Sequence, residues 1–336
     1  MTRGQELLDH LEGVGSLVIV CHNNPDPDCL ASALALMAIA DESGVDAVRL
    51  VASGEISHQE NRAFVNLLGV DVEPITEAAV ERSELVAFVD QSVPGRHNDL
   101  PPETSIDVVI DHHPIDDPVS AAFVDTRPEY GATATILVEY LRELGIEPSS
   151  TLASALLFAL HRERLDHIRR PTVREYEAAR YLFPLSDVEV LAHLYGAAFT
   201  MATVDAIGRA IGSRVIRGSV LVACTGRTPE RDALPQAADY LLNVEGVDTV
   251  LVVGRVGDSI CLSARSIDSR IHIGRVLERA LDDVGDAGGH QDMAGGHIPL
   301  GLLADGDHDT VLDIATDRIT ERFFEVLHMD TELIEE

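Results

Sequence analysis

Residues suited to metal chemistry cluster first in the segment of residues 22–28, which reads His-Asn-Asn-Pro-Asp-Pro-Asp. His22, Asp26 and Asp28 supply one imidazole and two carboxylates directly after a short apolar run and before a helical pattern. Such a set suits a hard or borderline divalent cation. The alternative is a turn in which Asp26 or Asp28 caps the following helix.

Two further segments end in residues of the same types. Asp90 follows an apolar run, and Asp111, His112 and His113 follow the apolar run Val108–Ile110. An aspartate after a strand often caps a loop, so Asp90 alone is weak evidence. Three strand ends that deliver aspartate and histidine to one edge of a sheet are harder to explain as turns, and they predict a metal site there.

The elements that must position these residues follow an α/β pattern. Short apolar runs alternate with amphipathic stretches, and each run is nearly continuous, so helices should cover both faces of the sheet. This predicts a doubly wound, mostly parallel sheet. The runs are residues 17–21, 48–52, 85–89 and 107–110, and helices are expected at residues 131–145, 150–162, 173–182 and 187–196.

A second, smaller α/β domain is expected after a boundary near residues 190–205. Its predicted strands are residues 219–224, 249–256 and 259–265, followed by a helix at 273–282, a glycine-rich loop and a last helix at 308–327. We therefore divide the chain into a metal-binding catalytic domain, residues 1–195, and a substrate-binding domain, residues 205–336. The active site is expected in the cleft between them.

Composition says more about environment than about partners. The 336 residues carry a formal charge of -32, and all 25 basic residues are arginine. A lysine-free, acidic surface is typical of halophilic archaea, because molar salt screens charge within about 3 Å. We expect a cytoplasmic protein. No apolar stretch approaches the roughly 20 residues of a membrane span. The cysteines contain no CxxC pair; they are Cys21, Cys29, Cys224 and Cys261.

The order of these motifs resembles the DHH phosphoesterase family, which includes RecJ-type exonucleases, nanoRNases, cyclic-dinucleotide phosphodiesterases and manganese-dependent pyrophosphatases. The resemblance covers essentially the whole chain. It implies one Mn²⁺ held by His22, Asp26 and Asp90, with Mg²⁺ or Co²⁺ as alternatives. It implies a second ion held by Asp28, Asp90 and His112, so that Asp90 bridges the two.

The same resemblance assigns His113 to the scissile phosphate and Asp111 to orienting the site. The chain departs from the family at the fourth motif, where an aspartate lies between two threonines. Glu163 takes the place of that aspartate, between Arg162 and Arg164. Glu163 is predicted to ligate the second ion with a longer arm. The alternatives are that Glu163 is a surface helix residue, or that Asp166, about one helical turn on, is a substitute ligand.

In the second domain, Gly288, Gly289 and His290 resemble the GGH signature of the DHH-associated domain, which grips the far end of a nucleotide substrate. Ser263 and Arg265 resemble its SxRS segment, whose arginine contacts phosphate, and a guanidinium suits bidentate phosphate binding. The alternatives are a flexible loop for the glycines and a surface ion pair for Arg265.

These observations together predict a hydrolase of short oligonucleotides, linear or cyclic dinucleotides, or 3′-phosphoadenosine 5′-phosphate (pAp). The alternatives are a manganese-dependent pyrophosphatase or exopolyphosphatase, and a nucleotide-binding regulator with weakened catalysis. Long nucleic acid is not an expected partner, because the chain has no basic run and only 4% aromatic residues. No membrane partner is expected, and a homodimer is left open.

Overall fold

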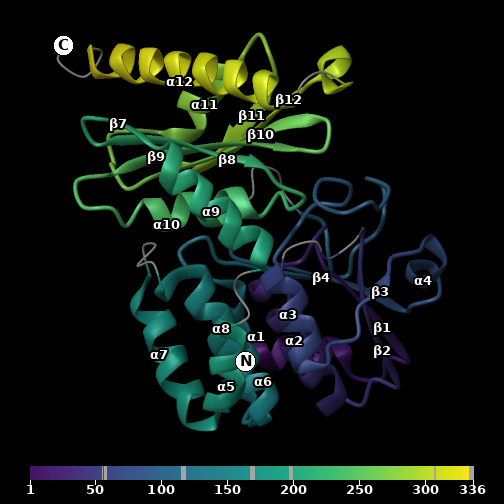
Figure 1. The fold of residues 1–336 in the computed structure, drawn as a ribbon. Coiled ribbons are helices and arrows are strands. Elements are labelled where there is room, and N and C mark those ends of the chain that lie inside the picture. The colour runs from purple at the N-terminus through teal and green to yellow at the C-terminus, as the bar shows by residue number, and fades with distance from the viewer. Residues whose placement is uncertain are drawn as a thin grey trace. The chain divides into compact units, whose positions relative to one another are not determined.

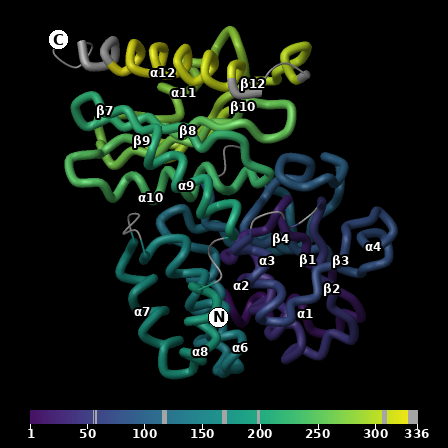
Figure 2. Tube along the Cα trace, in the orientation of Figure 1, coloured from purple at the N-terminus to yellow at the C-terminus, as the bar shows by residue number. Residues whose placement is uncertain are grey.

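The computed structural model of the chain describes residues 1–54, 56, 59–114, 119–166, 171–196, 200–305 and 308–332 (Figures 1 and 2). The chain divides into two units, Met1–Ala198 and Phe199–Glu336. Each unit is described by itself below.

The first unit is built on a six-stranded sheet in which every pair of neighbouring strands is parallel. The strands lie in the order β3-β2-β1-β4-β5-β6. Their bounds are β1 Ser16–Val20, β2 Ala47–Ala52, β3 Glu73–Pro74, β4 Leu85–Val89, β5 Val108–Asp111 and β6 Phe123–Thr126. The doubly wound parallel sheet expected from the sequence is confirmed.

Both faces of this sheet are buried, which explains the continuous apolar runs. In β1, Leu17 and Ile19 join the core formed with α1, α2, α5 and α6, whereas Val18 and Val20 join a smaller core on the opposite face. The helical elements are α1 Arg3–Leu11, α2 Pro27–Glu42, α3 Gln59–Leu68, α4 Glu77–Glu81, α5 Thr133–Leu144, α6 Ser150–Leu160, a π-helical turn His161–Leu165, α7 Val173–Leu182, a 3₁₀ turn Phe183–Leu185 and α8 Val188–Gly196.

The strand order reverses direction between β1 and β4. The chain first builds the sheet outward from β1 through β2 to β3, then returns to pair β4 with the other side of β1. In open parallel sheets, ligands bind outside the carboxyl ends of the strands at such a switch point. His22 and Asp90 lie just past the carboxyl ends of these two strands.

The second unit contains a mixed six-stranded sheet in the order β11-β12-β10-β9-β8-β7, in which only β8 and β9 pair in parallel. One face packs on α11 and α12, and the other packs on α9 and α10. The bounds are α9 Met201–Ser213, β7 Val215–Arg217, β8 Val220–Arg227, α10 Ala233–Leu241, β9 Thr249–Val256, β10 Ser259–Ser266, α11 Ile273–Leu281, β11 Asp286–Gly289, β12 Met293–Pro299, a 3₁₀ turn Gly301–Asp305 and α12 His308–Glu332.

The prediction of a glycine-rich loop in this unit was wrong, because Gly288 and Gly289 lie in β11, which pairs with β12. Glycine has low strand propensity and gives no apolar alternation, so the sequence hid this hairpin. Gly289 is required by packing, since a Cβ there would lie 2.3 Å from the carbonyl oxygen of Met293. A Cβ at Gly288 would meet nothing within 4 Å.

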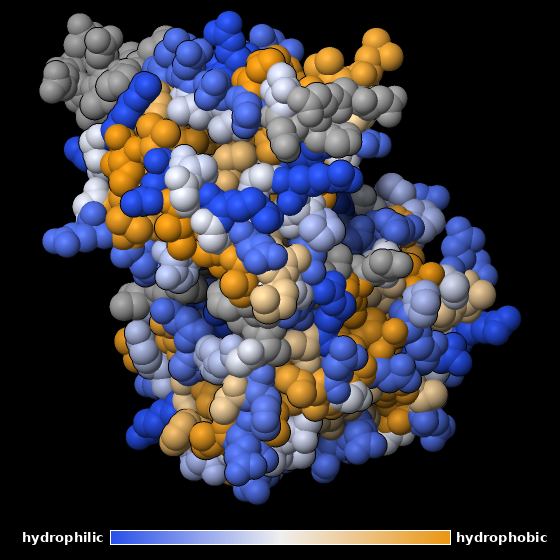
Figure 3. All heavy atoms as spheres, viewed as in Figure 1, coloured by the Kyte–Doolittle hydropathy of each residue, from blue (hydrophilic) through white to orange (hydrophobic). Residues whose placement is uncertain are grey.

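Hydrophilic and hydrophobic surface residues are interspersed over the face that is drawn in Figure 3. In the part of the chain that the structure describes, no single helix is both long and apolar enough to cross a bilayer. Helices α8 and α9 pass on length and composition only when the two are taken together.

Candidate metal centre

The three sequence segments meet at the carboxyl edge of the first sheet. His22 follows β1, Asp90 follows β4, and His112 follows β5. Asp26 is the N-cap of α2, and its Oδ1 accepts a hydrogen bond of 3.0 Å from the amide of Cys29. The same oxygen lies 3.9 Å from His22 Nε2. Asp26 therefore caps the helix, as the alternative interpretation expected, and also lies within the site.

Asp90 lies between two histidines and presents one carboxylate oxygen to each. Its Oδ2 is 3.6 Å from His22 Nε2, and its Oδ1 is 3.6 Å from His112 Nε2. Asp28 Oδ2 lies 3.8 Å from His112 Nε2 on the side of the second histidine. The side chains therefore form two groups that share Asp90, with Asp26 beside His22 and Asp28 beside His112.

Backbone carbonyls fix the orientation of both imidazole rings. His22 Nδ1 lies 3.0 Å from the carbonyl oxygen of Asn23, and His112 Nδ1 lies 3.2 Å from that of Tyr130. A carbonyl only accepts hydrogen bonds, so each Nδ1 carries the proton and donates it. In the neutral form, this tautomer presents an Nε2 lone pair to the carboxylates, which is the arrangement typical of a metal-binding histidine.

The N-terminus of α5 holds the two buried carboxylates from behind. The Oδ2 and Oδ1 atoms of Asp28 accept hydrogen bonds of 2.8 and 2.9 Å from the amides of Thr133 and Ala134, respectively. The hydroxyl of Thr133 donates to Asp90 Oδ1 at 2.8 Å. Sequence reasoning missed Thr133, since a threonine at the start of a predicted helix carries no signal of a contact with a strand end.

Uncompensated negative charge indicates that this site fits a cation. The pKa of Asp28 is raised well above its usual range by burial and by repulsion from Asp90, Glu163 and Asp26. The Oδ2 atom of Asp111 is buried without a hydrogen-bond partner among the described residues. A divalent ion would relieve this repulsion, and imidazole nitrogens with carboxylate oxygens suit Mn²⁺, Mg²⁺ or Co²⁺.

His113 and Asp111 form a pair at the rim of the site. The Oδ1 atom of Asp111 accepts hydrogen bonds from the backbone amide of His113 at 3.0 Å and lies 2.9 Å from its Nδ1. This hydrogen bond raises the pKa of His113 to about 9 against the effect of its partial burial. The side chain of His113 is 56% exposed, whereas that of Asp111 is 1% exposed. Asp111 thus orients an imidazole that faces solvent.

Glu163 lies in the π-helical turn that continues α6, and π-helical turns are frequent at functional sites. Its Oε1 is 3.4 Å from the guanidinium of Arg164. Its negative charge contributes to the raised pKa of both Asp28 and His113. Among the described residues, however, Glu163 belongs to neither compact ligand group at this site. Its role as a ligand stays a prediction.

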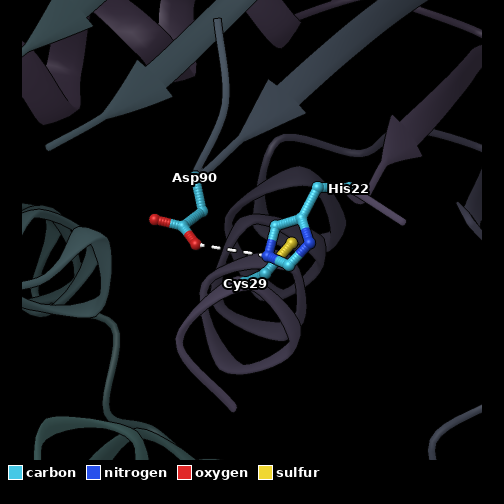
Figure 4. A group of neighbouring side chains, drawn as sticks. All are labelled: His22, Cys29 and Asp90. Atoms are coloured by element: carbon cyan, nitrogen blue, oxygen red, sulfur yellow. Dashed lines mark ion pairs between the residues drawn. The ribbon is translucent and has the colours of Figure 1, made fainter. Parts of the chain in front are cut away.

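Cys29 is a residue that the sequence did not single out. Possible ligand atoms of His22, Cys29 and Asp90 all lie within 4.8 Å of one another, and Figure 4 shows the sulfur next to the His22 ring. A cysteine one turn into a helix resembles any buried core residue, so only the fold reveals its position.

The predicted substrate residues of the second unit lie together around β10 and the β11–β12 hairpin. The Nε atom of Arg265 donates to Asp239 Oδ1 of α10 at 2.7 Å, and its Nη1 donates to Ser263 Oγ at 3.2 Å. In this structure Arg265 therefore forms an ion pair, which was the alternative to phosphate binding. The amide of His290 donates to the carbonyl of Met293 and closes the hairpin.

The fold and this site define an α/β protein with a candidate divalent-metal centre at the switch point of its first sheet. Residues 16–160 match the N-terminal domain of the DHH family, and residues 217–321 match the DHHA1 domain. The chain therefore contains a DHH-family N-terminal domain followed by a DHHA1 domain.

Relatives agree with this assignment. An uncharacterized protein of Methanocaldococcus jannaschii is 38% identical over 94% of this chain, and the match spans 65% of that protein's length. A protein of Listeria monocytogenes described as a probable manganese-dependent inorganic pyrophosphatase is 28% identical over 51% of this chain and 56% of its own. The chain thus spans less than two thirds of the length of each of these relatives.

Two solved structures show the same fold. The crystal structure of an exopolyphosphatase-related protein from Bacteroides fragilis has a TM-score of 0.78 at 15% identity, covering 99% of this chain and 98% of that one. Manganese-bound RecJ from Thermus thermophilus has a TM-score of 0.55 at 14% identity, covering 97% of this chain and 55% of that one.

Proposed function

We propose that this protein hydrolyses phosphate esters of short nucleotides, with two Mn²⁺ ions bound around Asp90. The substrate class comprises short oligonucleotides, linear or cyclic dinucleotides and pAp. The observation that carries the proposal is the division of one carboxylate between two histidines, with Asp90 Oδ2 at 3.6 Å from His22 Nε2 and Oδ1 at 3.6 Å from His112 Nε2.

Two divalent cations in such a centre would supply Lewis acidity toward a phosphoryl group and would neutralise negative charge on it. The residues of the chain supply the rest. His22 and Asp26 would hold one ion, Asp28 and His112 the other, and Asp90 both. Because His113 is exposed and oriented by Asp111, it is suited to donate a hydrogen bond to a phosphate oxygen as negative charge develops there.

The domain that the second unit matches supports a nucleotide substrate rather than a small inorganic one. It matches the DHHA1 domain, whereas the pyrophosphatase relatives align with only about half of this chain. Around β10, the guanidinium of Arg265 is paired with Asp239. The open position at Gly288 leaves room for a larger group.

The test is an assay of purified protein with Mn²⁺ in high salt against a panel of dinucleotides, cyclic dinucleotides and pAp. We expect release of mononucleotides or of phosphate, and no turnover of the whole panel would refute the proposal. His112→Gln is the matched loss variant, and Asp99→Asn, at the same sheet edge but outside both groups, is the control.

Hydrolysis of pyrophosphate or polyphosphate is the second candidate, because the similarity to the exopolyphosphatase-related structure covers both chains almost completely. Faster turnover of these substrates than of any nucleotide would favour it. Tight nucleotide binding without turnover, in protein that holds both ions, would instead favour a regulator with weakened catalysis.

A further inference from the structure

A sulfur atom lies against the first half of the metal centre. Cys29 lies in the first turn of α2, three residues after the Asp26 cap, and its side chain is fully buried. Its Sγ faces the end of β4, where the thiol donates a hydrogen bond of 3.6 Å to the carbonyl of Val89, the residue before Asp90. The thiol is therefore held at the base of the group formed by His22 and Asp90.

Distances in this group are close to those of a coordinated ion. Tetrahedral zinc with bonds of about 2.0–2.1 Å to nitrogen and 2.3 Å to sulfur separates its ligand atoms by roughly 3.5 Å. His22 Nε2 and Asp90 Oδ2 already lie 3.6 Å apart. All three ligand atoms lie within 4.8 Å of one another, so the sulfur needs to approach by little more than roughly 1 Å, as ligand bonds of this length imply.

The donor types then predict which ion this half of the centre prefers. Oxygen ligands suit Mn²⁺ and Mg²⁺, whereas a thiolate adds affinity for Zn²⁺ and Co²⁺. The two groups differ in this respect, because the group around His112 contains His113 and Asp90 but no sulfur among the described residues. Asp90 is thus shared by two groups. The group around His112 offers only nitrogen and oxygen atoms, whereas the group around His22 also has the sulfur atom of Cys29 nearby.

We propose that Cys29 is a ligand of the ion held by His22 and Asp90, and that it makes this half of the centre selective for zinc-like cations over Mn²⁺. On binding, a bond forms between the metal and Sγ, the S–H bond breaks and its proton passes to solvent. The hydrogen bond from Cys29 to Val89 is lost in exchange. Zinc is then expected to displace manganese from one half of the centre and to change its activity.

This inference rests on the metal centre of the proposed function, and the experiment separates the two. The protein is loaded with Co²⁺ under reducing conditions, and its absorption spectrum is recorded. Visible d–d bands report that cobalt is bound, and a near-ultraviolet charge-transfer band reports a thiolate ligand. We expect both in the wild type. Zinc-loaded wild type should also show a sulfur neighbour at about 2.3 Å by X-ray absorption.

Variants assign the sulfur. Cys29→Ser and Cys29→Ala should lose the charge-transfer band and keep the visible bands, whereas Cys261→Ser, a buried cysteine of the second unit, should keep both. We expect the Zn²⁺ affinity of Cys29→Ser to fall at least about tenfold, with Mn²⁺ affinity changed far less.

Visible bands without a charge-transfer band in the wild type would overturn the inference and leave the metal centre intact. Persistence of that band in both Cys29 variants would overturn it as well. Absence of any bound cobalt would overturn the metal centre itself, and the proposed function with it.

Discussion

Asp90→Asn should abolish binding of both proposed metal ions, because one carboxylate oxygen of Asp90 faces His22 and the other faces His112. Asparagine keeps the shape of the side chain and can still accept the hydrogen bond from Thr133. Position 90 has a positive φ of 59°, a region that asparagine tolerates better than alanine does. The substitution therefore removes charge with little backbone strain.

The expected loss of metal-dependent stability follows from the number of sites that lose a ligand. An ion present at 100 times its Kd stabilises the folded protein by about 2.7 kcal/mol, so two ions contribute about 5 kcal/mol. For a unit the size of Met1–Ala198, this corresponds to roughly 10–20 °C in Tm. A loss of about 100-fold in affinity at both sites would leave less than about 1 kcal/mol.

The assay is thermal unfolding with and without Mn²⁺, supported by calorimetric counting of bound ions. Asp90→Asn should lose nearly the whole manganese-dependent shift, His22→Ala should lose about half, and the control Asp99→Asn should lose none. A variant Asp90→Asn that still binds two ions, or that loses only as much as His22→Ala, would refute the shared-carboxylate reasoning.

Three further predictions concern other parts of the chain. Glu163→Gln should weaken the second Mn²⁺ by about 10- to 100-fold in calorimetry, and unchanged affinity would remove Glu163 from the ligand set. Gly289→Ala should lower the free energy of unfolding, measured in urea, by more than about 1 kcal/mol, because its Cβ would clash with Met293. Gly288→Ala should change this free energy by less than about 0.5 kcal/mol. Equal effects of the two substitutions would contradict this reasoning. Raising the salt concentration from about 0.1 M to 1 M should raise the Tm, since a net charge of -32 is then screened within about 3 Å, and a flat response would contradict a salt-adapted surface.

The fold of the first unit was predictable because a parallel strand buried on both faces leaves a continuous apolar run. Strands without such a run were missed. Phe123–Thr126 forms β6 although it contains Asp125, whose carboxylate is satisfied by Arg127 and Tyr140. The hairpin of β11 and β12 was missed because its glycines are set by backbone packing, which sequence periodicity does not record.

The edge of the sheet that carries the site was also predictable, since parallel strands bring their carboxyl ends together. Details set by distant elements were not. The contact of Thr133 with Asp90 depends on where α5 packs, and the pairing of Arg265 with Asp239 depends on α10. The position of Cys29 behind His22 depends on how α2 leaves its N-cap.

The shared carboxylate also has a consequence for folding. Its partners are far apart in sequence, from His22 after β1 to His112 after β5, and they meet only once β1, β4 and β5 have paired. The unfolded chain keeps His22, Asp26 and Asp28 close together, but Asp90 and His112 join them only in the assembled sheet, so the complete set of ligands forms late. Ions that need this complete set would bind to the assembled sheet, and their binding free energy would stabilise it against unfolding.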